Sequence, residues 1–380
     1  ELTTPGIIEF RKILHQYGER VAAIFFEFSS HALAQNRLGN IKLDVAGWTS
    51  FSQDHLDYHH TLEKYFAAKE KIYQQHLSPN SLLIIPAATG NWVEQLGKPS
   101  IKQAQTLKQR KVEFFPAFFR AEYNQKNLEV AWEICEQLWG KIEKIKIEEL
   151  RPPKGRFALI PYDSNYVIID YAHTPDALEN VLQAIKQGFP KYKINTLFGC
   201  GGDRDKSKRA LMAKAVEKFS DEMIIITSDN PRSELPGEII ADIKRGISVG
   251  AMSRVVVNEN RQQAIEAAIK NLTQQEVLLV AGKGHEEYQE INGVKYPFSD
   301  AEEVKKVIAR GAGVISAAWV AATPGVVNVS QGGINSFNQI TTDTRKIFGG
   351  ELFVALKGES FDATDFVESA LEQGASGVIF

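Results

Sequence analysis

Apolar residues follow two patterns along this chain, and the second half of the chain shows both most clearly. Short runs of β-branched and aliphatic residues alternate with longer segments in which apolar residues return every three or four positions. The runs predict buried strands, and the longer segments predict amphipathic helices. Regular alternation of strands and helices is typical of a parallel, doubly wound α/β sheet with right-handed crossovers.

In the second half we predict five strands, four helices between or after them, and a last helix. The predicted strands are 166–170, 194–198, 223–226, 254–257 and 277–281, and the predicted helices are 175–188, 209–219, 236–247 and 261–272. Thr174-Pro175 is typical of a helix start, and Asn292-Gly293 is typical of a tight hairpin turn. Ser299 with Glu302 predicts a capping box for the last helix.

The first half alternates less regularly, and its predicted elements are helices over 5–18, 61–76 and within 117–138, and strands over 21–28, 43–48 and within 80–86. Residues 21–28 are apolar except for Glu27, which is typical of a strand covered on both faces. Asn124 and Asn127 lie near the start of the last helix, where they either cap it or face a ligand. Residues 151–165 predict a hinge into a new domain.

Composition narrows the class of protein. The 380 residues suffice for two or three domains, and 43% hydrophobic with 24% charged residues is ordinary for a globular protein. A net charge of −3 gives no sign of nucleic-acid or membrane partners. Cys135 and Cys200 match no disulfide or metal spacing, and the first residues lack signal-peptide features, so we expect a cytoplasmic location.

Polar loops follow four of the predicted strands: DYAHTPD, GCGGDRDKSKR, SDNPR and GKGHE. Because ligands bind beyond the carboxyl ends of parallel strands, we expect these loops to meet at one ligand site. In SDNPR, Arg232 can hold a carboxylate bidentately, while Asp229 and Asn230 can hold an ammonium group. These groups suit a free amino acid, although each loop taken alone is also compatible with an ordinary turn.

The GCGGDRDKSKR loop adds positive charge to the predicted site. Gly201-Gly202 would let backbone N–H groups approach an anion. The basic side chains that follow are Arg204, Lys206, Lys208 and Arg209. The alternative interpretation is a solvated charge run.

The first half supplies candidate metal or phosphate ligands near strand and helix ends. Glu27 ends a predicted strand, His55 follows another, and Lys69 lies on a predicted helix. Carboxylate oxygens and an imidazole suit Mg²⁺ or Mn²⁺ better than Zn²⁺. The alternative for Glu27 and His55 is a buried polar side chain whose hydrogen bonds are satisfied.

The motifs TTP, EFSSHALAQNR, DHLDYH, AAK, NQKN, GRF, DYAHTPDAL, GCGGDRDKSKR, SDNPR and GKGHEEY, in this order, resemble the Mur ligase family over about residues 1–310. The resemblance implies an ATP-dependent ligase of peptidoglycan synthesis that forms an amide bond through an acyl phosphate. It also implies a carboxylated lysine and Mg²⁺, since metals and cations offset phosphate charge.

The SDNPR form resembles the branch of the family that adds meso-diaminopimelate to UDP-N-acetylmuramoyl-L-Ala-D-Glu (UDP-MurNAc-L-Ala-D-Glu). The distal carboxylate of diaminopimelate gives Arg232 a partner, whereas lysine would leave the guanidinium unpaired at a cost of ~1–3 kcal/mol.

Carried over motif by motif, the resemblance implies four groups of site residues. The catalytic and magnesium-binding residues would be Glu27, His55 and carboxylated Lys69. Contacts to the UDP-sugar peptide would come from Thr3, Ser29 and Arg37, and nucleotide contacts from Asn127, Arg156, Asp170 and His173. The amino-acid pocket would comprise Arg204, Asp229, Asn230, Arg232, Gly282 and Glu286.

We therefore expect a partial ATP-binding central domain over 1–150, an amino-acid-binding ligase domain over 151–310 and a linker over 311–335. Residues 336–380 resemble the start of a second Mur ligase, the one that adds D-alanyl-D-alanine, so the chain would be part of a fused bifunctional ligase. The P-loop of the family would precede TTP, and we expect the 380-residue chain alone to have little or no ligase activity.

Two alternatives remain open. One is a ligase similar to folylpolyglutamate synthetase, which shares the domain plan, and the other is a non-catalytic remnant that still binds an amino acid or a nucleotide. A nicotinamide-dependent dehydrogenase is disfavoured, because no G-x-G-x-x-G follows a first strand.

Overall fold

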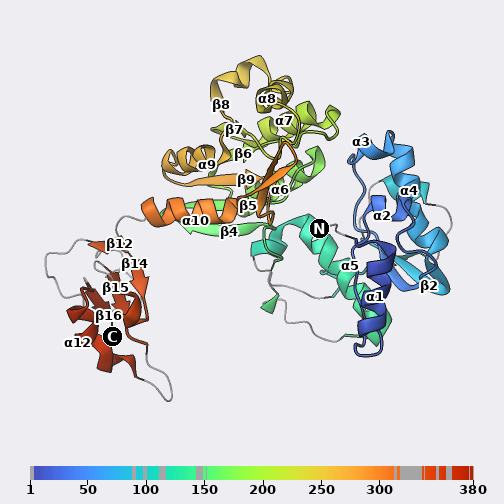
Figure 1. The fold of residues 1–380 in the computed structure, drawn as a ribbon, viewed down its shortest axis with the longest axis horizontal. Helices are drawn as coiled ribbons and strands as arrows, with labels where there is room; N and C mark the ends of the chain where they lie inside the picture. The colour runs from blue at the N-terminus through green and yellow to red at the C-terminus, as the bar shows by residue number, and fades with distance from the viewer. Residues whose placement is uncertain are drawn as a thin grey trace. The chain divides into compact units, whose positions relative to one another are not determined.

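The computed structural model describes residues 4–87, 91–96, 101–110, 117–142, 149–150, 152–311, 315–316, 336–337, 339–347, 351–356, 362–375 and 377–379. The chain forms two compact units, residues 1–301 and 302–380 (Figure 1). Within the first unit we call residues 4–142 the first lobe and residues 152–301 the second lobe.

The second lobe is built on a six-stranded sheet with the strand order β4-β5-β9-β6-β7-β8, and all neighbours are parallel except β4 with β5. The strands are β4 Ala158–Tyr162, β5 Asn165–Asp170, β6 Lys193–Phe198, β7 Ile224–Thr227, β8 Val255–Asn258 and β9 Glu276–Ala281. The predicted parallel, doubly wound sheet is confirmed. The predicted hinge over 151–165 is wrong in part, because β4 pairs there with β5 as an antiparallel edge strand.

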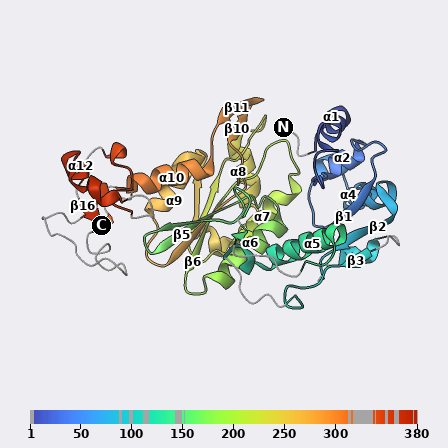
Figure 2. The ribbon, with the colours of Figure 1, turned by 90° about the horizontal axis from the view of Figure 1, so that it is seen from below.

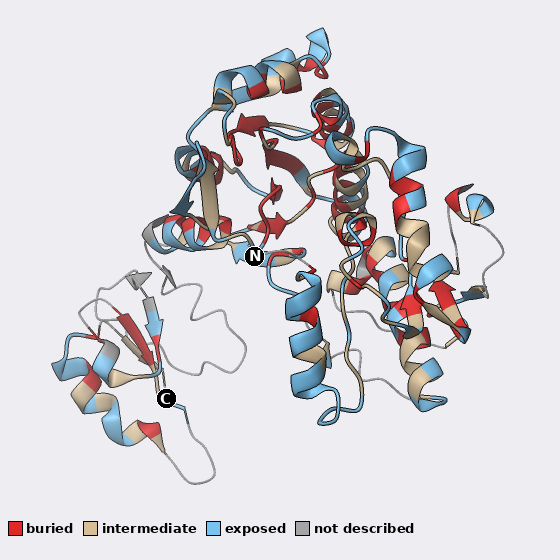
Figure 3. Ribbon diagram, turned by 45° about the vertical axis from the view of Figure 1, so that its right-hand side comes forward, coloured by how far each residue is buried: buried red, intermediate tan, exposed pale blue. Residues whose placement is uncertain are grey.

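Helices cover both faces of this sheet. They are α6 Pro175–Gly188, α7 Ser207–Phe219, α8 Pro236–Lys244, α9 Arg261–Lys270 and the 3₁₀ turn η4 Val249–Arg254. Helix α10 Asp300–Gly311 begins at the end of this unit. Residues of α6, α7 and α8 join alternate strand residues such as Ile168 and Leu279 in one buried cluster. Helix α9 contacts β6 to β9 but contributes nothing to that cluster, so it covers the opposite face. Figure 3 shows the sheet strands as largely buried.

Two local predictions in this lobe are confirmed. The Thr174 hydroxyl caps α6 by accepting a hydrogen bond from the Ala177 N–H at 3.2 Å. Strands β10 Tyr288–Ile291 and β11 Val294–Pro297 form a hairpin, which stands apart from the large sheet in Figure 2. Asn292 and Gly293 have φ values of 49° and 77°, the left-handed conformation that a two-residue hairpin turn requires.

The first lobe contains a smaller parallel sheet with the order β1-β2-β3. Its strands are β1 Leu43–Gly47, β2 Leu77–Ile85 and β3 Ile101–Gln103. Its helices are α1 Ile7–Tyr17, α2 Ser30–Ala34, α3 Leu56–His59, α4 Leu62–Gln75 and α5 Glu122–Trp139, with 3₁₀ turns η1 Asn91–Gln95 and η2 Ala117–Arg120. Trp48 stacks on Trp92 with ring centroids 5.1 Å apart at the centre of an aromatic core.

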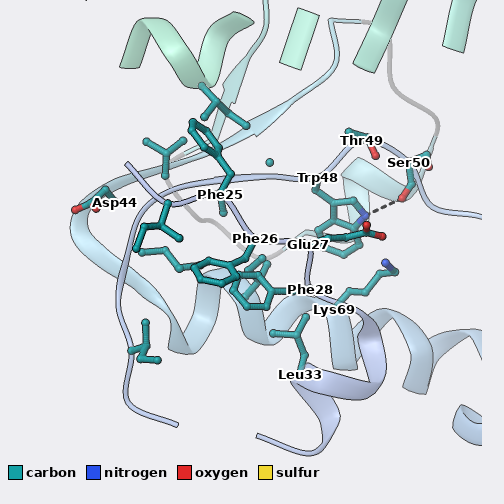
Figure 4. A pocket seen from close by; sticks show the side chains of 18 of the residues that line it. Phe25, Phe26, Glu27, Phe28, Leu33, Asp44, Trp48, Thr49, Ser50 and Lys69 are labelled. Carbon is teal, nitrogen blue, oxygen red and sulfur yellow. Dashed lines mark hydrogen bonds between the residues drawn. The ribbon is translucent and has the colours of Figure 1, made fainter. Parts of the chain in front are cut away.

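The predicted strand over 21–28 is wrong. This stretch has no strand partner among the described residues, and Phe25 is 62% exposed. Its apolar side chains are accommodated by ring packing instead, because buried Phe10 of α1 lies 4.2 Å from the Phe26 ring. The stretch and β1 line a pocket of about 860 Å³, which Figure 4 shows.

Of the two alternatives for Asn124 and Asn127, capping of α5 is excluded. The residue at the N-cap is Ala121, and Asn124 lies inside the helix, where its Nδ2 donates to the Phe118 carbonyl at 2.9 Å. Asn127 is exposed on the same helix.

The smaller unit is also an α/β arrangement. Its parallel sheet has the order β14-β15-β16, with β14 Gln339–Thr341, β15 Glu351–Val354 and β16 Gly377–Ile379. The other elements are β12 Ile315–Ser316, β13 Ser336–Phe337, α12 Val367–Glu372, η5 Thr344–Lys346 and η6 Ala363–Phe366. Phe353 and Ala370 form its buried core with Ile347. Within the described parts of the chain, no helix has the length and apolarity needed to cross a membrane.

Candidate active site

The four polar loops lie where the topology predicts. They follow β5, β6, β7 and β9, which occupy neighbouring positions in the sheet and run parallel. A cleft of about 1000 Å³ opens beside them and is also lined by residues of the first lobe. The candidate residues that line it are Glu27, Ser29, Arg37, His55, Lys69, Arg156, His173, Arg204, Asp229, Asn230, Arg232, Gly282 and Glu286.

Three candidate residues are not among those that line the cleft. Thr3 lies outside the described residues, and Asn127 is exposed on α5. Asp170 is buried at the end of β5, where its two carboxylate oxygens accept hydrogen bonds from the Phe157 and Ala172 N–H groups, each at 2.8 Å. Burial raises the pKa of Asp170 even though these hydrogen bonds favour its charged form. In this structure Asp170 ties the GRF loop to the loop after β5.

Three residues that line the cleft, Asp229, Asn230 and Glu286, contact Lys283, a residue that the sequence reasoning did not single out. Its side chain is fully buried, and its Nζ lies 3.3 Å from Asp229 Oδ1, 3.1 Å from Asn230 Oδ1 and 2.9 Å from Glu286 Oε2. Burial opposes ionisation of Asp229, but the charges of Lys283 and Arg261 outweigh it and lower the Asp229 pKa. Asp229 and Asn230 thus already hold an ammonium group, which the protein itself provides.

Arg232 is held in an unusual backbone conformation beside this cluster. Its φ of 51° lies in the left-handed region, which non-glycine residues seldom adopt. The β10–β11 hairpin holds it there, because Arg232 N donates to the Glu290 carbonyl at 3.0 Å and Asn292 N donates to the Arg232 carbonyl at 2.8 Å. The guanidinium donates through Nη1 to the Gly202 carbonyl at 2.8 Å and faces Glu290 through Nε.

The glycine pair after β6 serves close packing more than anion binding. The Gly202 N–H is used internally, since it donates to the Asn230 carbonyl at 2.9 Å. A Cβ on Gly202 would come within 1.9 Å of the Pro231 carbonyl oxygen, so only glycine permits this approach between the two loops. The expectation that the Gly202 N–H is available to an anion is therefore wrong.

The four basic side chains of this loop divide into two roles. Arg209 is buried and pairs with Glu234 and Asp242, and exposed Lys206 also reaches Glu234 at 3.0 Å. Arg204 and Lys208 instead line the cleft.

Asp54 is a second important residue that the sequence reasoning missed. Its carboxylate lies 3.2 Å from Lys208 Nζ, 3.6 Å from His173 Nε2 and 3.4 Å from His55 Nε2, so it links both lobes at the cleft. Burial opposes its ionisation, but the His173 hydrogen bond and the Lys208 charge hold the Asp54 pKa well below its usual range. The available signal was its position directly before His55 in DHLDYH.

The three candidate metal ligands share one side of the cleft. Figure 4 shows the Glu27 carboxylate and the Lys69 amine on the same side of the neighbouring pocket, close to Ser50. Burial lowers the pKa of the Lys69 ammonium, although the charges of Asp54 and Glu27 act in the opposite direction. Burial likewise lowers the pKa of His55 to about 4.

Among the described residues, no group of three or more His, Cys, Asp or Glu side chains is arranged to hold a metal. A site made from Glu27, His55 and a modified Lys69 therefore stays a prediction.

Thr4 organises the UDP-sugar-peptide candidates. Its hydroxyl donates to the Glu27 carbonyl at 2.9 Å and accepts from the Ser29 N–H at 3.1 Å, and its carbonyl accepts from Arg37 Nη1 at 2.8 Å. The Ser29 hydroxyl also caps α2. Thr4 is the second threonine of the TTP motif, whereas the sequence analysis named the first, Thr3.

A parallel sheet whose charged strand-end loops face a second lobe across a cleft has the architecture of an α/β enzyme. Residues 1–149 match the family model described as Mur ligase middle domain, and residues 155–284 match the one described as Mur ligase, glutamate ligase domain. The chain therefore belongs to the Mur ligase family of ATP-dependent acid–amino-acid ligases, and its fold is that of the family.

Relatives agree with this assignment. The UDP-N-acetylmuramoyl-L-alanyl-D-glutamate–2,6-diaminopimelate ligase of Rickettsia typhi is 38% identical over 336 residues, which cover 81% of this chain and 67% of that protein. The ligase of the same name from Aquifex aeolicus is 39% identical over 331 residues, 80% of this chain and 67% of that protein. A solved structure of a ligase with that name covers 81% of this chain and 69% of its own at 31% identity, with a TM-score of 0.47.

Proposed function

We propose that the cleft binds meso-diaminopimelate and that the chain takes part in its ATP-dependent ligation to UDP-MurNAc-L-Ala-D-Glu in peptidoglycan synthesis. The observation that carries the proposal is the convergence of Arg204, Asn230, Arg232 and Glu286 from three strand-end loops on one cleft, opposite Lys69 of the first lobe. The names of the relatives at 38–39% identity support this choice of substrates. A cytoplasmic location is part of the proposal.

Arg232 carries the proposed selectivity for diaminopimelate. Its Nη2 has no hydrogen-bond partner among the described residues, while Nη1 and Nε are held by Gly202 and Glu290. A guanidinium held in place in this way can still donate to a carboxylate through Nη2. The distal carboxylate of diaminopimelate would accept from Nη2, and lysine has no group to replace it.

Glu27, His55 and a carboxylated Lys69 would together hold Mg²⁺. The lowered pKa of Lys69 supports this, because only a neutral amine adds CO₂ to become a carbamate, which supplies oxygen ligands that suit the ion. Bound Mg²⁺ would offset the negative charge of phosphate groups. Arg156 and His173, which line the same cleft, and Asn127 and Asp170, which do not, remain proposed nucleotide contacts. If the ¹³C NMR spectrum of the protein in ¹³C-labelled bicarbonate at neutral pH showed no carbamate signal, the modification of Lys69 would be contradicted.

The domain division over 1–150, 151–310, 311–335 and 336–380 is likewise proposed. Residues 336–380 would begin a second ligase, the one that adds D-alanyl-D-alanine, on the strength of Asp343-Thr344-Arg345 and ALKGE. A parent polypeptide that ended shortly after residue 380 would contradict this fusion.

Isothermal titration calorimetry of the 380-residue chain tests the amino-acid site. We expect meso-diaminopimelate to bind about tenfold or more tightly than L-lysine, since lysine has no distal carboxylate to accept from the remaining nitrogen of Arg232, Nη2. Arg232→Met should weaken binding of diaminopimelate while leaving lysine affinity unchanged. Arg245→Met, which removes an exposed guanidinium at the C-cap of α8, is the matched control and should change neither affinity. Equal affinities for the two amino acids in the wild-type chain would overturn the proposal.

A further inference from the structure

The buried Lys283 ammonium donates to three acceptors that belong to the proposed amino-acid site. A lysine ammonium has three N–H donors, and here three oxygens from two loops lie within 3.3 Å: Asp229 Oδ1, Asn230 Oδ1 and Glu286 Oε2. The ammonium also lies 5.7 Å from the Tyr288 ring centroid. The fully buried Lys283 contributes nothing to the open surface, so its effect on a ligand must pass through these partners.

The cluster determines which atom of Asn230 faces the cleft. Asn230 Oδ1 accepts both from Lys283 Nζ and from the Glu290 N–H, the latter at 2.9 Å. Both of those groups can only donate, so the amide cannot be turned over without losing two hydrogen bonds. Its Nδ2 uses one of two N–H groups to donate to Glu286 Oε2 at 2.9 Å, and the second N–H has no acceptor among the described residues. Asn230 consequently offers a donor to a ligand, which suits a carboxylate and not the ammonium first expected.

The same cluster leaves one atom of Glu286 for a cation. Glu286 Oε2 accepts from both Lys283 and Asn230, whereas Glu286 Oε1 has no hydrogen-bond partner in the described part of the chain. Glu286 lines the cleft, and its side chain is only 18% exposed. An ionised oxygen in that position is suited to an ammonium group.

We propose that Lys283 is a positioning residue, which holds Asn230 as a donor and Glu286 as an acceptor so that the cleft recognises a carboxylate beside an ammonium. This inference rests on the proposed function and deepens it, because the two groups are those of a free amino acid. In this proposal Lys283 does not contact the substrate. Its own ammonium occupies the oxygen of Asn230, so the ammonium of the substrate would bind to Glu286 instead.

A double-mutant cycle measured by titration calorimetry with meso-diaminopimelate tests the proposal. We expect Lys283→Met and Asn230→Ala each to weaken binding by about tenfold, the effect of one charged hydrogen bond. The double variant should lose clearly less than the product of the two factors, because Lys283 acts in part through Asn230. Losses that multiply would show a merely structural role for Lys283 and would overturn the proposal. Lys218→Met, which removes an exposed ammonium at the end of α7, is the matched control.

A second variant covers the case in which Lys283→Met does not fold. Asn230→Asp keeps the acceptor for Lys283 and the Glu290 N–H but replaces the free donor with an acceptor. We expect it to bind meso-diaminopimelate about tenfold more weakly, and wild-type affinity would overturn the assigned orientation of Asn230. Absence of binding by the wild-type chain would instead overturn the proposed function. If the wild-type chain binds meso-diaminopimelate and the variants bind it equally well, the proposed role of Lys283 is overturned while the proposed function stands.

Discussion

The two lobes of the larger unit are built from the same alternation of helix and strand. They differ in whether the apolar runs of the sequence form strands. In the second lobe the central strand residues Val167, Leu197 and Leu279 are fully buried. In the first lobe the apolar stretch 21–28 forms no strand, and Phe25 stays largely exposed. An apolar run thus becomes a strand only where a neighbouring backbone supplies the hydrogen bonds.

Two buried arginines, one in each lobe, differ in whether their carboxylate partner also has a second cation. Arg261 and Asp300 are both fully buried and form a bidentate pair with two contacts of 2.7 Å. Arg110 of the first lobe pairs with Glu133 at 2.6 Å, but Lys102 also reaches Glu133 at 2.6 Å. Glu133 therefore keeps a second cation when Arg110 is removed, whereas Arg261 is the one cation paired with Asp300 among the described residues.

The largest expected effect tests this difference directly. Arg261→Met should lower the free energy of unfolding by about 3–5 kcal/mol, because it leaves the Asp300 carboxylate buried without a counter-charge. Arg110→Met should cost only about 1–3 kcal/mol, since Lys102 remains beside Glu133. Urea unfolding followed by circular dichroism measures both. Equal losses would break the comparison.

Truncation of an apolar side chain should likewise cost more stability in the second lobe than in the 21–28 stretch of the first lobe. Leu279→Ala removes a fully buried side chain from the central strand β9 and should cost about 2–5 kcal/mol. Phe25→Ala removes a side chain that is 62% exposed and should cost less than about 1 kcal/mol. The midpoint of urea unfolding for each variant checks this expectation. A large loss at Phe25 would show that the 21–28 stretch is held more firmly than its exposure indicates.

A pH-dependent effect should appear in the loops of the second lobe. The hydrogen bond from Arg209 is the main cause that lowers the pKa of Glu234 to about 2, with further contributions from Lys206 and the Asp203 N–H. A depressed carboxyl pKa stabilises the fold above the unfolded value of about 4.3 and loses this contribution as the pH falls toward 2.

Glu234→Gln should therefore cost roughly 1–3 kcal/mol at neutral pH, and the difference from wild type should shrink below about pH 4. Urea unfolding at a series of pH values measures that difference. A difference that stays constant from neutral to acidic pH would contradict the role of the Glu234 charge.

The smallest expected effect compares two glycines of the second lobe. Gly202→Ala would place a Cβ 1.9 Å from the Pro231 carbonyl oxygen, and forcing the loops apart should cost about 1–3 kcal/mol. Gly188 ends α6 with nothing within 4 Å of an added Cβ, so Gly188→Ala should be neutral or stabilise by about 0.4–1 kcal/mol. Thermal melts of both variants distinguish a close approach from an open position. Similar shifts in Tm would contradict the packing explanation.

Much of the second lobe was predictable from the sequence. Strands buried on both faces appear as continuous apolar runs, so 166–170, 194–198 and 277–281 were located close to their observed bounds. The meeting of Arg204, Arg232 and Glu286 in one cleft was predictable as well, because carboxyl ends of parallel strands share an edge. The 21–28 stretch was not, since its composition is that of a strand and only the lack of a partner differs.

The sequence by itself determined the order of helices and strands, the edge of the sheet at which the polar loops meet and the types of charged group gathered there, because these follow from local periodicity and a topological rule. Only the tertiary structure decided which of those groups already form hydrogen bonds or ion pairs within the protein. Lys283 meets Asn230 across 53 positions of the chain, and Lys208 meets Asp54 across 154. Hydrogen-bond partners so distant in sequence leave no local pattern, and they determine which donors and acceptors remain free for a ligand.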